Sequence, residues 1–283
     1  MSVITLTTDF GARDWFVGTM KGVIAGIAPN ANVIDLTHEL RPGDLRGGAF
    51  ALAASYQFFP KGTIHVVVVD PGVGSHRRAI AVRTAKGIFV GPDNGVLSWA
   101  LAKERITAIH ALENEAYFLQ RVSRTFHGRD VFAPVAAHLV RGVPIRNLGP
   151  AIKGFVRSDW PQPRQRSGTV TGEVIYVDRF GNGITNLESS LLRGAGRASC
   201  EVRARGRWVC PVRTFYQAAE PKTPVAVAGS SGFLEIAING GSAEAALGIR
   251  IGTVVVLRTG RIAGASRKRK APRKPWLSEG RHR

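Results

Sequence analysis

The stretch HVVVVDPGVGSHRRAIAV, from His65 to Val82, contains four consecutive valines followed at once by an aspartate and a glycine-rich turn. Four β-branched residues without a polar neighbour favour a strand that is buried on both faces. Asp70 then lies at the carboxyl end of that strand, where open α/β sheets bind their ligands. Gly72 and Gly74 allow the chain to return tightly toward Arg77. The stretch therefore predicts either a ligand-facing carboxylate or, more simply, an aspartate that begins a turn and pairs with an arginine.

The first half of the chain alternates strand-like and helix-like segments around this stretch. Strand-like segments include VITLTTD, ANVIDLTH, AIAVRT and GIFVGPDN, and helix-like segments include WFVGTMKGVIAGIA, GGAFALAASYQFF, NGVLSWALAK and FAPVAAHLVRG. This alternation predicts an α/β catalytic domain over residues 1–158, with a mainly parallel sheet covered by helices. Asp9, Asp70 and Asp93 each follow a short apolar strand, so we expect them to share one edge of the sheet.

The second half has a different pattern. The segment SDWPQPRQRSG interrupts the alternation with prolines and polar residues, which predicts a linker over residues 159–168. Short strands separated by turns follow, among them GTVTGEVIYVD, CEVRARGRWVC and IGTVVVLR. They predict a smaller all-β, barrel-like domain over residues 169–260.

The two cysteines, Cys200 and Cys210, flank a predicted hairpin. A two-residue turn at Arg205 and Gly206 would place Cys200 opposite Pro211, so a disulfide is not expected. Neither cysteine has the neighbours of a metal site, and no metal is predicted anywhere in the chain.

The charge of the protein is strongly positive. The formal net charge of the 283 residues is +19, and much of it lies in the predicted basic tail, residues 261–283. From Ser266 the tail carries eight lysines and arginines against Glu279 alone, which favours disorder and weak contact with a polyanion, or a merely solvated appendage. The chain contains no apolar run of membrane-spanning length and no leader-like start, so we predict a cytoplasmic protein without a membrane contact.

Two further segments contain side chains suited to binding or catalysis. In YVDRFGNGITNLE, from Tyr176 to Glu188, an aromatic ring lies beside amide groups, a combination that suits a heteroaromatic ligand, although a hairpin with an Asn-Gly turn is the simpler interpretation of this segment alone. In TFHGRD, from Thr125 to Asp130, His127 begins an apolar helix and could be a capping or core residue.

Six motifs in order give the chain a specific resemblance. It resembles the S-adenosyl-L-methionine (SAM) hydroxide adenosyltransferases, the adenosine-forming SAM hydrolases related to fluorinase and chlorinase. The motifs extend over nearly all of the chain up to about Arg258: TTDFG (Thr7–Gly11), DPGVGSHRR (Asp70–Arg78), GPDNG (Gly91–Gly95), TFHGRD (Thr125–Asp130), DRFGN (Asp178–Asn182) and GSSGFLEIAINGGSA (Gly229–Ala243).

The resemblance implies a catalytic set and an assembly. The set of the hydrolases matches Asp70, Arg77 and His127, whereas fluorinase has a tyrosine at the position of Asp70 and lacks the other two. A homotrimer is also implied, with active sites between the first domain of one subunit and the second domain of its neighbour. SAM is then the substrate, adenosine and L-methionine are the products, and no cofactor is needed.

The resemblance also implies the binding residues. Asp9 should bind the ribose hydroxyls, and Asp178 and Ser230 the methionine end. Phe215 or Tyr216 is expected to stack on the adenine, and Gly229 departs from the asparagine expected before the serine pair. The residues expected around the adenine are Phe180, Asn182, Asn239 and Gly240.

The chemistry that follows is attack of water or hydroxide at C5′ of SAM, in line with the departing sulfur. Because the sulfonium makes methionine a good leaving group, positioning of the water should carry much of the rate. Asp70 would orient the water, His127 would hold it or relay its proton, and Arg77 would keep Asp70 charged. One alternative is an Mg²⁺-dependent phosphohydrolase that uses Asp9, Asp70 and Asp93. Another is a non-catalytic nucleic-acid binder that acts through the basic tail.

Overall fold

The chain divides into two compact units, Met1–Asp159 and Trp160–Arg283. The structure is a computed structural model, and it describes residues 3–166, 168–192, 200–206 and 208–259. The basic tail predicted over residues 261–283 lies outside the described residues. None of the described helices combines the length and the apolar character that crossing a bilayer requires.

The first unit is built on one six-stranded sheet with the strand order β2-β1-β3-β5-β4-β6. Its strands are β1 (Val3–Thr8), β2 (Asn32–Thr37), β3 (Thr63–Val68), β4 (Ala79–Thr84), β5 (Gly87–Pro92) and β6 (Ile106–Ala111). The pairs among β2, β1, β3 and β5 are parallel, but β4 is antiparallel to both β5 and β6.

The sheet is therefore mixed, and the expectation of a mainly parallel sheet is not confirmed. Only two residues separate Thr84 at the end of β4 from Gly87 at the start of β5. A connection of that length can form a hairpin, whereas a parallel pair needs a crossover of a dozen residues or more.

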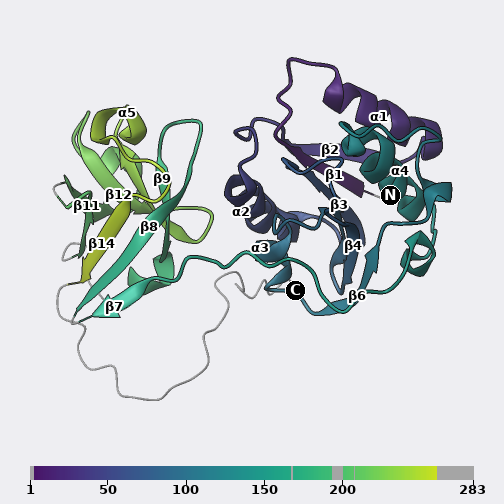
Figure 1. The fold of residues 1–283 in the computed structure, drawn as a ribbon. Coiled ribbons are helices and arrows are strands. Elements are labelled where there is room, and N and C mark those ends of the chain that lie inside the picture. The colour runs from purple at the N-terminus through teal and green to yellow at the C-terminus, as the bar shows by residue number, and fades with distance from the viewer. Residues whose placement is uncertain (1–2, 167, 193–199, 207, 260–283) are drawn as a thin grey trace, which may run out of the picture. The chain divides into compact units, whose positions relative to one another are not determined.

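Helices cover both faces of this sheet (Figure 1). Helix α1 packs against α4, and α2 packs against α3. The helices are α1 (Phe16–Ile27), α2 (Leu45–Ser55), α3 (Ser98–Leu101) and α4 (Ala133–Val140), with the π-helical turn η3 (Gly128–Phe132) directly before α4. Short 3-10 turns are η1 (Tyr56–Phe58), η2 (Glu115–Tyr117) and η4 (Ile145–Leu148).

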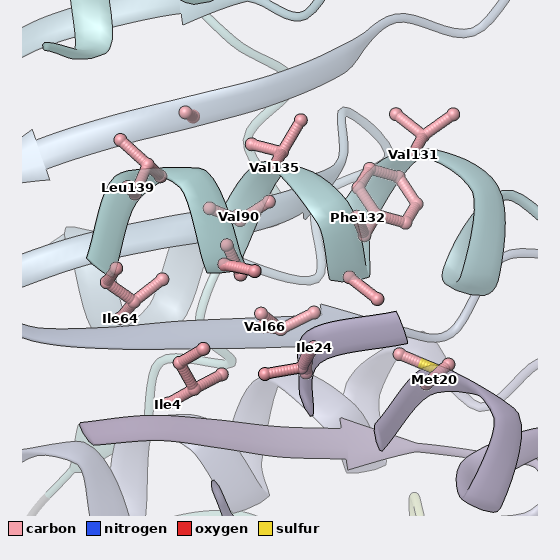
Figure 2. Packing of buried hydrophobic residues seen from close by; sticks show 14 of the residues in the cluster. Ile4, Met20, Ile24, Ile64, Val66, Val90, Val131, Phe132, Val135 and Leu139 are labelled. Atoms are coloured by element: carbon pink, nitrogen blue, oxygen red, sulfur yellow. The ribbon is translucent and has the colours of Figure 1, made fainter. Parts of the chain in front are cut away.

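The core of the first unit lies between the sheet and the α1–α4 pair. Figure 2 shows Met20 and Ile24 of α1 and Phe132 and Leu139 of η3 and α4 against strand residues that include Val66. All six residues of β1 and of β3 are buried, as the valine run predicts for central strands. This packing fixes the ends of β1 and β3 side by side.

The second unit is a closed barrel. Its ring runs β14-β10-β11-β12-β13-β9-β8, and β14 pairs again with β8, which confirms the barrel-like prediction. The strands are β8 (Thr169–Val177), β9 (Gly183–Glu188), β10 (Cys200–Ala204), β11 (Trp208–Arg213), β12 (Pro224–Ala228), β13 (Phe233–Ile238) and β14 (Val254–Thr259). Helix α5 (Ala243–Leu247) and the 3-10 turns η5 (Ser189–Leu192) and η7 (Tyr216–Ala218) complete it.

The segment predicted as a linker contains a strand of its own. Strand β7 (Arg164–Arg166) pairs with the start of β8, outside the ring. Just before it, the Trp160 ring stacks on Phe233 with ring centroids 5.2 Å apart, and Asn186 donates to the Pro161 carbonyl. These contacts place residues 160–166 on the second unit.

The cysteine hairpin has a different register from the predicted one. Val202 lies opposite Cys210, and Glu201 lies opposite Pro211, because one residue more than expected separates the paired ends of the strands. Both cysteines are buried, and burial raises the pKa of the Cys210 thiol to about 12.

A buried imidazole, His65, links the central strands. Its Nδ1 shares a hydrogen bond of 2.8 Å with the Thr5 hydroxyl of β1, and its ring stacks on Phe89 of β5 at 5.0 Å between centroids. The side chain is 2% exposed, and this burial lowers the pKa of His65 to about 4. His65 is therefore neutral in the folded protein at neutral pH.

Acid should destabilise the first unit through His65. The pKa in the folded state lies below the ordinary value of 6.5, so this contribution to stability is complete above pH 6.5 and decreases as the pH falls toward 4. The total loss is about 3 kcal/mol, since each tenfold change in proton affinity is worth about 1.4 kcal/mol. Denaturant titrations from pH 7.5 to 4 should show that the free energy of unfolding depends less steeply on pH in His65→Phe than in the wild type. Equal slopes would contradict this origin.

Candidate active site

The three aspartates singled out by the sequence lie at the same edge of the sheet. The strands β1, β3 and β5 are neighbours and run parallel. Asp9 and Asp93 directly follow β1 and β5, and Asp70 lies two residues after the end of β3. Their side chains nevertheless have different partners, so the shared edge does not make one three-carboxylate cluster. Among the described residues, no group of three or more His, Cys, Asp and Glu side chains could hold a metal ion.

Asp70 forms a buried ion pair with Arg77. The Arg77 Nε lies 3.0 Å from both Asp70 carboxylate oxygens, and the Arg77 Nη2 donates to Oδ2 as well. The two side chains are only 4% and 11% exposed, respectively. Such multiple, desolvated contacts fix the orientation of the carboxylate.

The loop between them requires one of its glycines. Gly74 has a φ of +75°, and a Cβ at this position would lie 2.2 Å from the backbone oxygen of Arg124. The Gly72 carbonyl accepts from the Ser75 amide, which tightens the same turn. The short return to Arg77 thus depends on backbone contacts that leave no room for a side chain at position 74.

His127 completes the set. The Arg77 Nη2 lies 2.7 Å from His127 Nδ1, although 50 residues separate the two in the chain. A guanidinium only donates hydrogen bonds, so Nδ1 accepts, and the neutral ring carries its proton on Nε2. Burial and the Arg77 charge lower the pKa of His127, against the opposing effect of Asp70 and Asp130. The arrangement therefore presents a neutral Nε2–H donor.

Two residues that the sequence analysis did not assign support this set. The Asp130 side chain is completely buried and accepts from the Arg129 guanidinium and the Ser123 amide. The Arg77 guanidinium lies over the Phe132 ring, 5.5 Å from its centroid. The carboxylate in TFHGRD was a visible signal for Asp130, whereas nothing in the sequence places Phe132 beneath an arginine.

Asp93 belongs to a separate ion pair. Its Oδ2 accepts from Arg78 Nε at 2.8 Å, and its Oδ1 accepts from the Val156 amide at 2.6 Å. The side chain is 2% exposed. Asp93 therefore holds the 154–156 segment against β5, and it is not placed with Asp70 as a ligand.

Asp9 lies beside the loop of Asp70. Its Oδ2 accepts from the Gly43 amide at 2.7 Å. Gly43, with a φ of +73°, faces Pro71, since a Cβ on it would lie 3.9 Å from the Pro71 Cβ. The first unit thus brings the loops of Asp9 and Asp70 together.

The remaining predicted binding residues lie on the second unit. Asp178 Oδ1 accepts from the amides of Phe180 and Asn182, and its Oδ2 accepts from the Asn182 side chain at 3.0 Å. This local network holds the turn between β8 and β9, while the Phe180 ring stays 76% exposed. The DRFGN motif therefore forms the connection between β8 and β9 and supports an exposed ring. Its tight turn runs from Asp178 to Gly181, whose φ is +78°, and not through the Asn182–Gly183 pair, because Gly183 already begins β9.

A second group surrounds β13. Asn239 donates to the Ala219 carbonyl at 2.7 Å, so its amide nitrogen holds the loop that contains Phe215. The Tyr216 hydroxyl donates to Glu235 Oε2 at 2.6 Å, whereas the neighbouring Phe215 ring is 58% exposed. Ser230 and Gly240 are both exposed near the ends of β13.

Glu235 explains the unexpected glycine at position 229. A Cβ on Gly229 would lie 1.8 Å from Glu235 Oε1, so the carboxylate fills the space of a side chain there. Burial raises the pKa of Glu235, and the nearby Asp178 charge adds to this shift although the Tyr216 hydrogen bond opposes it. The sequence analysis missed Glu235, whose position in an apolar strand was its only signal.

The fold and the site together define a protein with an α/β unit that carries an Asp-Arg-His set at a strand edge, followed by a β-barrel unit. Family models of the same two-part organisation match the chain: the SAM hydroxide adenosyltransferase N-terminal domain matches residues 4–149, and the C-terminal domain matches residues 172–256. The chain belongs to the SAM hydroxide adenosyltransferase family.

Individual relatives agree with this assignment. The chain is 42% identical to an (R)-S-adenosyl-L-methionine hydrolase of Salinispora arenicola, over 88% of this chain and 95% of the relative. It is 40% identical to another of Thermus thermophilus, over 91% and 100%. A fluorinase of Actinoplanes sp. is 27% identical over 84% of this chain. The crystal structure of an uncharacterised conserved protein from Thermotoga maritima superposes with a TM-score of 0.84 at 34% identity, covering 91% of this chain and all of that one.

Loss of the Arg77 charge should raise the pKa of His127. The Arg77 guanidinium lowers this pKa, whereas Asp70 and Asp130 raise it, so Arg77→Met removes the opposing charge and frees Nδ1 to bind a proton. An NMR titration of the ring signals measures the change. Arg78→Met is the matched control, because Arg78 pairs with Asp93 instead. An unchanged or lower pKa in Arg77→Met would contradict the assigned contact.

Proposed function

We propose that this protein hydrolyses SAM to adenosine and L-methionine by in-line attack of water or hydroxide at C5′. The observation that carries the proposal is the Asp70–Arg77–His127 set, held by direct hydrogen bonds within a chain of this family. Relatives named (R)-S-adenosyl-L-methionine hydrolase, at 40% and 42% identity over most of the chain, support the same reaction.

The bonds and protons of this reaction balance simply. The oxygen of water forms a bond to C5′, the C5′–S bond breaks, and its electron pair returns to sulfur, which becomes the neutral thioether of methionine. One proton of the water is released. The leaving group needs no acid, so the protein has to position the water and accept or discharge its proton.

Each member of the set has a role that its contacts support. Asp70 would accept a hydrogen bond from the water and orient its lone pair toward C5′. Arg77 holds both carboxylate oxygens and thereby fixes the orientation of Asp70. Because His127 Nδ1 accepts from Arg77, we propose that His127 donates from Nε2 to the water oxygen and does not act as the base.

The binding residues are proposed from the same resemblance. Asp9, beside the Asp70 loop, would bind the ribose hydroxyls. Asp178 and Ser230 would bind the methionine end, and Phe215 is the better candidate for stacking on adenine because the Tyr216 hydroxyl is engaged by Glu235. Residues proposed around the adenine are Phe180, Asn182, Asn239 and Gly240.

No observation favours the two alternatives. The phosphohydrolase reading requires Asp93 as a ligand, and its two carboxylate oxygens already bind Arg78 and the Val156 amide. The tail that would bind nucleic acid lies outside the described residues. The homotrimer, the cytoplasmic location and the absence of a cofactor stay predictions.

The reaction itself is tested by product analysis. Purified protein incubated with SAM should form adenosine and methionine in equal amounts, with and without a chelator, and in ¹⁸O-labelled water the label should enter the 5′-hydroxyl of adenosine. Chromatography with mass spectrometry measures both. Turnover that requires a metal, or 5′-chloroadenosine as the main product in chloride, would reject the proposal.

Asp70→Asn should lower kcat by a factor of roughly 10² to 10⁴ while the Kd for SAM changes little, because orientation of the water acts mainly in the transition state. Asp93→Asn is the matched control, since it weakens another buried Asp–Arg pair at the same sheet edge. It should lower thermal stability but retain kcat per folded molecule. A fully active Asp70→Asn would end the water-positioning role.

A further inference from the structure

A cavity of about 330 Å³ lies on one side of the Asp-Arg-His set. Arg77 and His127 border it, whereas Asp9 and Asp70 are not among its lining residues. The β3–β4 loop and the end of β6 form part of its wall, together with the segment that leads into η3. The cavity therefore reaches the set from the β4–β6 side, whereas the loops of Asp9 and Asp70 lie at β1 and β3.

The lining combines apolar and charged groups in a way that suits water more than the substrate. Leu112, Phe118, Val122 and Val131 supply apolar walls. The charged or titratable groups in the lining are His76, Arg77, Arg78, His127 and the exposed Glu113 and Glu115. This cavity lies entirely within the first unit, and none of the proposed adenine or methionine residues lines it.

The free nitrogen of His127 connects the cavity to the reaction. Nδ1 faces Arg77, and the hydrogen bonds of the described residues give Nε2 no partner. A neutral ring with its proton on Nε2 can donate to a water molecule at the cavity end next to Arg77.

The proposed reaction needs a path by which water reaches C5′ while SAM is bound. In-line displacement requires the water to reach C5′ from the side opposite to the sulfur, and every turnover consumes one water and releases one proton. A bound SAM would cover the side of Asp9, where the ribose is proposed to lie. His127 cannot relay the proton while Nδ1 accepts from Arg77, so the proton needs another route to solvent.

We propose that this cavity is the inlet for the attacking water and the outlet for its proton, with His127 Nε2–H as the last donor before C5′. The inference rests on the proposed function and adds a route that the substrate does not use. The carboxylates of Glu113 and Glu115 favour a departing proton, since they place negative charge in the cavity wall.

The test narrows the cavity without touching the catalytic set. Val122 lines the cavity and is 42% exposed, so a larger side chain is accommodated at its rim with little effect on the core. The series Val122→Leu, Val122→Phe and Val122→Trp should lower kcat progressively, by about tenfold or more for Trp, with an unchanged Kd for SAM by calorimetry. Val122→Ala widens the cavity and should retain kcat. Val156→Trp is the matched control, because Val156 is 47% exposed and does not line the cavity.

The outcomes separate the two proposals. A wild type without SAM turnover rejects the function. An active wild type with full kcat in Val122→Trp, or with a raised Kd at unchanged kcat, overturns the water route, because the second result assigns the cavity to substrate. Thermal melts show whether a variant has lost folded protein. If Val122→Trp does not fold, the decrease in kcat is measured on Val122→Leu and Val122→Phe, which are smaller changes.

Discussion

The ion pair between Asp70 and Arg77 is the contact on which the site depends. It joins the end of the central strand β3 to the start of β4, and through Nη2 it reaches His127 before η3. Because both charged groups are almost completely buried, removal of either would leave the other without compensation. Arg77 also fixes the tautomer of His127, so one guanidinium orients the carboxylate and determines which ring nitrogen carries the proton.

Much of the fold follows from local sequence. The valine run predicted a central strand, and the strand endings predicted the common edge of Asp9, Asp70 and Asp93. The mainly parallel sheet is not confirmed, because the alternation pattern received more weight than the connection length. The two residues between Thr84 and Gly87 favour an antiparallel hairpin of β4 and β5. The register of the cysteine hairpin differs by one residue from the predicted one, because composition alone determines the length of a turn poorly.

The site was less accessible from local patterns. The approach of His127 to Arg77 spans 50 residues, and only the ordered motifs predicted it. Asp130, Phe132 and Glu235 support their neighbours through tertiary contacts that no spacing rule contains. Asp93 had the same local signature as Asp70, and only its hydrogen bonds to Arg78 and the Val156 amide distinguish a structural carboxylate from a catalytic one.

The contact between Gly229 and Glu235 constrains how this barrel can change during evolution. Any side chain at position 229 collides with a carboxylate that Tyr216 holds in place, so the two positions cannot be altered independently. An asparagine at position 229 therefore requires a shorter residue 235 or a Glu235 carboxylate turned away from its present position. In the second case the hydrogen bond to Tyr216 is lost, so a change in the loop before β13 is transmitted to the loop that contains Phe215.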